Sequence, residues 1–198
     1  MMKQLLIILA IFGLSGCQIN KPLSLTTTNL ENTSCNIPVS ELTVVSPLKG
    51  ENVFRFEDII SSGVVTPAAT VALGGYKRAD FNYLLEEDSE SVIKETFKDL
   101  FPKTGNTPAL LNINFNYYIT DTGAMSNKII LAMTAKLEQP GNEHIKAVTT
   151  LHSSYSTFPL TYPSSDYLNT LFSEGLVKLE KEICSKAKLL QQENLADH

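Results

Sequence analysis

Three successive segments in the second half of the chain alternate apolar and polar residues, and this pattern limits the fold more than any other feature of the sequence. A period of two predicts β-strands with one buried face and one wet face. The connections between the segments are short and polar, which predicts antiparallel neighbours in a three-stranded meander. The segments run from Leu111 to Ile119, from Lys128 to Glu138 and from His144 to about Phe158.

Two amphipathic segments are the natural cover for the apolar face of this meander. The first follows the acidic run 86–90, in which Asp88 or Ser89 can cap a helix and the acids suit its positive end. The second starts after Pro163-Ser164-Ser165-Asp166 and continues weakly to Leu190. Apolar residues repeat at helical spacing in both: Ile93, Phe97, Leu100 and Phe101 before Pro102, and Leu168, Phe172, Gly175, Leu176, Leu179 and Ile183. Charged residues mark the expected wet side of the second helix: Lys178, Glu180, Lys181 and Glu182.

The first half of the folded region carries weaker signals. Residues 41–45 and 69–73 favour strands, residues 81–85 alternate, and Gly74-Gly75 favours a hairpin between the last two. Residues 46–68 predict irregular structure. The expected fold is therefore α+β, with an antiparallel sheet whose three-stranded meander is covered on one face by two amphipathic helices.

The N-terminus has the pattern of a secretory signal. Lys3 precedes an apolar run of about ten residues, roughly half of what a helix needs to cross a bilayer. Leu14-Ser15-Gly16-Cys17 then resembles the lipobox of bacterial lipoproteins, in which the cysteine thiol is the lipid attachment point. The resemblance implies a signal peptide over residues 1–16 and lipidation of Cys17. The alternative is ordinary cleavage beside an incidental cysteine.

Lipidation makes the membrane the first predicted partner, because two acyl chains already anchor a protein stably. Gln18 follows the cysteine, whereas Asp at that position is the usual signal for retention in the inner membrane of well-studied Gram-negative bacteria. The expected location is the outer membrane, with the lipid-anchored domain facing the periplasm.

The segment behind the anchor reads as a tether. Residues 17–38 are rich in Thr, Asn and Ser and lack apolar periodicity, so they predict a flexible segment that spans up to roughly 56 Å between the anchor and Cys35. A single periplasmic domain is expected over residues 39–190. Residues 191–198 also lack a period and are expected to form a disordered tail.

Two cysteines remain if Cys17 carries lipid. Cys35 and Cys184 form an even pair in a compartment where disulfides persist, which predicts a bridge between them. The alternative is two unpaired thiols. A bridge would close a loop of about 150 residues, and the chain-entropy model gives it at most roughly 5 kcal/mol.

Composition excludes several function classes. The 198 residues, 43% of them hydrophobic, leave room for one mid-sized core and exclude a large multidomain enzyme. The formal net charge of −5 comes with no block of Lys or Arg, so nucleic acid is not an expected partner.

No catalytic, metal-binding or cofactor-binding constellation is predicted, and the protein is expected not to be an enzyme. His144 and His152 share a strand face but lie roughly 26 Å apart, too far to share a metal ion. His152 and Ser153 are strand neighbours and point to opposite faces, so they cannot pair as base and nucleophile. The acidic run 86–90 lacks the spacing of an EF-hand loop, and residues 74–78 lack the pattern of a phosphate loop.

Asn112, Asn114 and Asn116 are the least ordinary feature of the chain, because all three fall on one face of the first alternating segment. A solvated polar face is the plain interpretation. The alternative is a hydrogen-bonding surface for a polysaccharide or a partner strand. Together with Asp121, which begins the loop after this strand, these asparagines are the candidate partner-binding residues.

The order of these features resembles a known family. A lipobox, a Thr/Asn-rich tether, early strands, a helix such as 91–101, a meander and a closing helix such as 165–190 look like the small Gram-negative envelope lipoproteins of the YajG type. LptE-like lipoproteins have the same order, which implies the plug of a lipopolysaccharide translocon as one role. Of the functional residues, the resemblance carries over Cys17 alone.

Two functions are consistent with these observations. The first is a non-enzymatic scaffold or accessory subunit of an envelope complex, anchored in the outer membrane and contacting another envelope protein. The second is a lipid- or glycolipid-binding envelope module of LptE-like type, with an apolar cleft between the long helix and the sheet.

Overall fold

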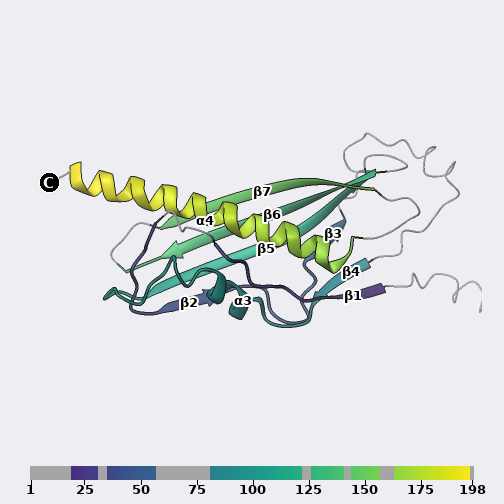
Figure 1. Ribbon diagram of the computed structural model, residues 1–198, viewed down its shortest axis with the longest axis horizontal. Coiled ribbons are helices and arrows are strands. Elements are labelled where there is room, and N and C mark those ends of the chain that lie inside the picture. The colour runs from purple at the N-terminus through teal and green to yellow at the C-terminus, as the bar shows by residue number, and fades with distance from the viewer. Residues whose placement is uncertain are drawn as a thin grey trace, which may run out of the picture.

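The computed structural model describes residues 19–30, 35–56, 81–121, 126–140, 144–156 and 163–196. These residues have an α+β architecture with a two-stranded sheet, a five-stranded sheet and two helices (Figure 1). Cys17, the strand expected at 69–73 and the hairpin expected at Gly74-Gly75 lie outside them. No helix within the described ranges is both long enough and apolar enough to cross a membrane.

The larger sheet is mixed, and the expectation of a purely antiparallel sheet is wrong. β5, β6 and β7 pair antiparallel in sequence order, as the short connections predict, whereas β2 and β3 both pair parallel with β5 on its other edge. Antiparallel neighbours are joined by hairpins, but β2 and β3 reach β5 through long connections, and long connections permit parallel pairing. The strands are β2 (Leu42–Val45), β3 (Phe54–Phe56), β5 (Ala109–Asp121), β6 (Ser126–Glu138) and β7 (Ile145–Ser156).

The strand register aligns the apolar residues of the three long strands on one face, which forms the core. Phe115 lies opposite Met133, and Tyr117 lies opposite Leu131. Helix α4 (Ser165–Ala196) lies across this face (Figure 1). Its whole predicted apolar stripe is buried, as predicted: Leu168, Phe172, Gly175, Leu176, Leu179 and Ile183.

Glycine allows α4 to approach the sheet closely. A Cβ at Gly175 would lie 2.3 Å from Sδ of Met133. One turn earlier, the ring of Phe172 packs 4.9 Å from the ring of Phe115. Side chains therefore fill the space between the middle of α4 and the sheet.

The first predicted helix is shorter than its apolar repeat. α3 covers Ser89–Thr96, and a turn follows it, yet Phe97, Leu100 and Phe101 are all buried as predicted. Asp88 occupies the N-cap position without making the capping hydrogen bond. Its Oδ1 instead accepts a hydrogen bond of 2.7 Å from the backbone N–H of Lys49.

The predicted tether is largely packed against the domain. Ile19–Leu23 forms strand β1, which pairs parallel with β4 (Phe81–Leu85), and Leu23 is fully buried. We call residues 19–30 and 35–39 the N-terminal strap. Its start contacts the start of α4, because Oγ of Ser165 donates a hydrogen bond of 3.1 Å to the carbonyl oxygen of Pro22.

A disulfide fixes the other end of the strap to the same helix. The structure contains the predicted bridge between Cys35 and Cys184, which are 149 residues apart in sequence. Further along, the backbone N–H of Ile37 donates to the carbonyl oxygen of Leu100 at 2.8 Å, and the Ile37 side chain is buried. The strap belongs to the fold because scattered apolar side chains and backbone hydrogen bonds hold it there, in place of the periodic pattern that marks a strand or helix.

Two further expectations about α4 are wrong. The helix continues to Ala196, so most of the expected disordered tail is helical, with exposed side chains at Gln191 and Gln192. Glu180, expected on the wet side, is only 3% exposed. Its Oε1 lies 3.3 Å from Sγ of Cys184 one turn later, so the bridged strap covers the side of α4 on which Glu180 lies.

Candidate partner-binding face

The sheet is covered on one face by α4, and its opposite face is the candidate site. We call this surface the open face; it is made of the even-numbered positions of the three long strands. Figure 1 views the sheet from the side of α4, so the open face points away from the viewer. The half-buried or exposed residues that form its centre are Asn112, Asn114, Asn116, Ala132, Thr134, Lys136, Lys146, Val148 and Thr150.

The three predicted asparagines lie together at the β5 side of the open face. Nδ2 of Asn114 donates a hydrogen bond of 3.1 Å to Oδ1 of Asn112, and Asn114 is exposed. The register places Asn112 opposite Lys136 and Asn114 opposite Thr134. The row therefore presents amide donors and acceptors beside hydroxyl and ammonium groups, a surface suited to hydrogen bonding.

The rest of the face carries both charged and apolar side chains. Lys136 and Glu138 form an ion pair with an N–O distance of 2.6 Å, and the hydrogen bond from Lys136 lowers the pKa of Glu138. Val45 and Val148 are 48% and 52% exposed, so each adds apolar area to this largely polar face. Val45 on β2 lies directly beside Asn112, whereas Val148 on β7 is separated from the asparagine row by β6.

Asp121 does not join the asparagine row. It is the last residue of β5, where the register sets it opposite Asn127. At about 3.3 Å per residue it lies roughly 16 Å along the strand from Asn116. The asparagines and Asp121 thus mark two separate places.

His152 and Ser153, the possible base and nucleophile considered above, lie on opposite faces of the sheet. His152 is exposed on the open face, opposite Ile130. Ser153 faces the helix side, where its hydroxyl is hydrogen-bonded to the hydroxyl of Tyr167 on α4. Adjacent strand residues therefore point apart here as the alternation requires.

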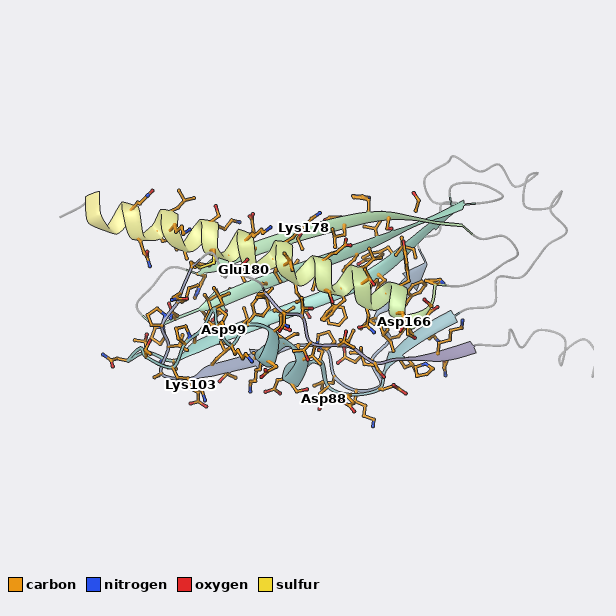
Figure 2. The ribbon with its side chains drawn as sticks, viewed as in Figure 1. Asp88, Asp99, Lys103, Asp166, Lys178 and Glu180 are labelled. Carbon is orange, nitrogen blue, oxygen red and sulfur yellow. A yellow bond between two sulfur atoms is a disulfide. The ribbon has the colours of Figure 1, made fainter. Side chains whose placement is uncertain are left out.

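The acidic run has local partners. The carboxylate of Glu86 accepts a hydrogen bond from the hydroxyl of Ser24, and Glu90 pairs with Lys94 one turn later on α3. Among the described residues, no three His, Cys, Asp or Glu side chains are grouped closely enough to hold a metal ion. The charged residues labelled in Figure 2 are likewise dispersed, with Asp166 at the start of α4 and Lys103 towards the opposite end of the molecule.

The apolar cleft expected for a lipid-binding module is not found between the middle of α4 and the sheet, where Phe172 and Phe115 are in contact. Two open hollows lie elsewhere on the described surface. One, of about 410 Å³, is lined by Thr28, Ser173, Glu174, Val177, Lys178 and Lys181. The other, of about 450 Å³, lies beside the acidic run and is lined by charged residues and Ser91.

The structure contains a second asparagine row, which the sequence did not predict. Nδ2 of Asn82 donates to Oδ1 of Asn20 at 2.9 Å, and Nδ2 of Asn52 donates to Oδ1 of Asn82 at 2.8 Å. These residues come from three segments far apart in sequence; the pairing of β1 with β4 joins Asn20 to Asn82, and a β-bridge to Leu84 brings in Asn52. No local pattern of the sequence signals such a row.

Comparisons with known proteins show a distant likeness in structure. No protein-family model matches the chain, and no curated protein matches it. The similar solved structures include a Xanthomonas campestris protein of the family DUF330, with 11% identity, a TM-score of 0.46 and coverage of 89% of this chain and 99% of that one. Rare lipoprotein B from Shewanella oneidensis is also 11% identical, with a TM-score of 0.34 and coverage of 80% and 99%.

A minor lipoprotein from Acinetobacter baumannii is another similar structure, with 11% identity, a TM-score of 0.34 and coverage of 74% of this chain and 89% of that one. Two of these three neighbours are thus described as lipoproteins. At such identities and TM-scores the neighbours assign neither a family nor an activity. The fold and the site define an α+β domain with one covered and one open sheet face.

Proposed function

We propose that this protein is a non-enzymatic lipoprotein of the bacterial envelope, anchored in the outer membrane through Cys17, whose open face binds an envelope protein. The lipobox resemblance of residues 14–17 supports the anchor. The observation that carries the binding role is the open face itself: three long paired strands that α4 covers on one side only.

The composition of the open face favours a protein partner that binds reversibly. Its asparagines, threonines and lysines form hydrogen bonds with water in the free protein. Exposed Val45 and Val148 add apolar contact area to the same face. Protein interfaces that form and dissociate combine polar and apolar surface in this way.

Photo-crosslinking in living cells tests the binding role. A photoreactive amino acid is placed singly at Asn114, Thr134 and Thr150, which are exposed on the open face. Matched controls carry it at Glu174 and Lys178, which are exposed on α4 on the other side of the sheet. We expect all three open-face positions, and neither control, to yield the same protein adduct. Adducts to lipid alone, or identical adducts from both sides, would contradict the proposal.

The anchor has its own test. The intact mass of the mature protein should exceed that of the chain beginning at Cys17 by a diacylglycerol and an N-acyl group. Cys17→Ala should abolish this mass and release the protein from the membrane fraction. A mature chain without acyl groups would refute the anchor and leave the binding role of the open face standing.

A further inference from the structure

We infer that the protein is oriented with its long axis away from the membrane surface. The end at which β1 and α4 begin contacts the lipid head groups. The inference rests on the proposed lipidation of Cys17. Beyond that anchor, it specifies which surface of the domain contacts the bilayer and how the domain is oriented.

The first observation is the short connection between Cys17 and the fold. β1 begins at Ile19, so two residue steps separate the anchor from a paired strand. Even fully extended, two steps span at most about 7 Å. A free segment of the predicted length would instead allow the domain to move tens of Å from the bilayer. The acyl chains therefore hold the start of β1 at the level of the head groups.

The second observation is that β1 cannot swing away from the domain as a loose arm. All five of its residues pair with β4, and Leu23 is fully buried. Asn169 of α4 clamps the chain just beyond β1: its Nδ2 donates to the carbonyl oxygen of Ser24 at 2.6 Å, and its Oδ1 accepts from the backbone N–H of Thr26 at 3.1 Å. A force applied at the anchor is therefore transmitted to the start of α4.

The third observation is that this attachment lies at one extreme of the long axis. In Figure 1, β1, β4 and α4 all begin at the same end of the molecule, and the C-terminus lies at the opposite end. α4 has 32 residues, which at 1.5 Å per residue gives a length of about 48 Å. An anchor at the centre of a long side would let the protein lie flat, whereas an anchor at one end favours an upright domain.

The chemistry of this end suits a head-group surface. The hydrogen-bonded row of Asn20, Asn82 and Asn52 lies one residue in from the start of β1, and Asn20 and Asn52 are exposed. Neutral amides donate to phosphate oxygens and accept from ammonium groups without the cost of burying a charge. The expected occupant of this surface is the same bilayer that holds the acyl chains.

Energy transfer to the membrane tests the orientation, with α4 as the ruler. A fluorophore is attached through an unnatural amino acid at Asp166 or at Lys188, both exposed and about 33 Å apart along the helix. The full-length lipidated protein is reconstituted into vesicles of phosphatidylethanolamine and phosphatidylglycerol that contain an acceptor-labelled lipid. We expect transfer from Asp166 to exceed transfer from Lys188 several-fold. Equal transfer from both, or the reverse order, would overturn the inference.

A spacer variant isolates the role of the short connection. Twelve Gly and Ser residues inserted between Gln18 and Ile19 have an end-to-end distance of roughly 17–21 Å and leave the lipobox unchanged. The spacer should keep the protein on vesicles and abolish most of the difference between the two positions. A difference that survives the spacer would show that another surface sets the orientation.

The mass of the reconstituted protein distinguishes an error in the proposed anchor from an error in the inferred orientation. A protein without acyl groups would overturn the proposed anchor, and the orientation with it. An acylated protein with equal transfer from both positions would overturn the orientation alone.

Discussion

At the scale of single residues, Gly105 marks a close approach between the strap and the turn that precedes β5. A Cβ here would lie 2.5 Å from the carbonyl carbon and oxygen of Pro38 and 2.7 Å from the nitrogen of Val39. These are backbone atoms, which cannot rotate away as a side chain can. We expect Gly105→Ala to lower the free energy of unfolding by about 1–3 kcal/mol, the usual range for overpacking, in urea denaturation.

Gly175→Ala is the matched control. Its Cβ would meet Sδ of Met133, which lies near the end of a flexible side chain and can move. Alanine also stabilises a helix interior over glycine by up to about 1 kcal/mol, which offsets part of the clash. The loss should therefore be smaller than for Gly105→Ala, and an equal or larger loss would contradict the argument.

Tyr117 gives the protein a specific sensitivity to alkali. Its hydroxyl donates a hydrogen bond of 2.9 Å to the carbonyl oxygen of Leu168, and burial raises the pKa of Tyr117 above its usual value. The folded state therefore keeps a proton that the unfolded state releases above about pH 10. Stability is fully present below that pH and falls above it, by up to about 1.4 kcal/mol per pH unit.

Tyr117→Phe should remove this sensitivity. At pH 7 the variant should lose about 0.5–1.5 kcal/mol with the hydrogen bond. Between about pH 10 and 11.5 its stability should decline less steeply than that of the wild type, as urea midpoints at several pH values would show. Parallel declines in the two proteins would rule out Tyr117 as the source.

Residues whose burial depends on one local period were predictable from the sequence. The alternating residues of β5 and β6 and the apolar stripe of α4 occupy the expected faces because strand and helix geometry fix those faces. Glu180 was predicted incorrectly, and Asp88 occupies its predicted N-cap position without the capping hydrogen bond, since their surroundings come from the strap and from the loop at Lys49. Such contacts depend on tertiary structure, which a local pattern does not encode.

At the scale of elements, the strap depends on its disulfide. The bridge closes a loop of 149 residues, and loops of this length give bridges a stabilisation of about 2–5 kcal/mol. The double variant Cys35→Ser/Cys184→Ser should therefore show a Tm lower by several degrees in calorimetry. Wild-type protein melted in reductant should approach the same Tm. A double variant with an unchanged Tm would mean that the strap is held without the bridge.

The end of α4 should contribute little to stability. Among helix residues 165–192, whose burial the structure describes, Ala187 is the last buried one, Leu190 is partly buried, and Gln191 and Gln192 are exposed. Deleting residues 191–198 should change the free energy of unfolding by no more than about 0.5 kcal/mol, as for other exposed surface changes. A loss above about 1 kcal/mol in chemical denaturation would show that this turn packs against something.

The two helices and the three long strands were predictable as elements, whereas β1 and the parallel pairing of β2 and β3 were not. β1 reads Ile-Asn-Lys-Pro-Leu, which has no alternation and contains a proline. It forms a strand because it is an edge strand, where a missing N–H is tolerated. Short connections predict antiparallel hairpins, but no comparable local feature of the sequence predicts parallel pairing.

At the scale of the whole molecule, the folded unit includes residues from Ile19 onwards, so the expectation that the domain begins at residue 39 is wrong. A chain that starts at Val39 would lose buried Leu23 and Ile37, the pairing of β4 with β1, and the disulfide. Each buried side chain alone contributes about 1.5–3 kcal/mol. The sum approaches the whole stability of an ordinary domain, so we expect the shortened chain to lack a cooperative thermal transition.

A chain that starts at Gln18 is the matched control, and it should melt cooperatively without any lipid. Near-ultraviolet circular dichroism would compare the packing of the two chains directly. Cooperative unfolding of the chain that starts at Val39 would show that the strap is an accessory and no part of the folding unit.

The long-range pairing of the strap also sets the order in which the protein can assemble. β1 has no partner until residue 81 has been made, β2 has none until residue 109, and Cys35 has none until residue 184. During synthesis from the N-terminus, the described strands of the first third of the chain therefore emerge before the strands with which they pair, and Cys35 emerges as an unbonded thiol. In the export that the proposed anchor implies, correct oxidation requires that Cys35 remain unbonded until nearly the whole chain has crossed the membrane, so chaperones should affect the yield of this protein more than its length implies.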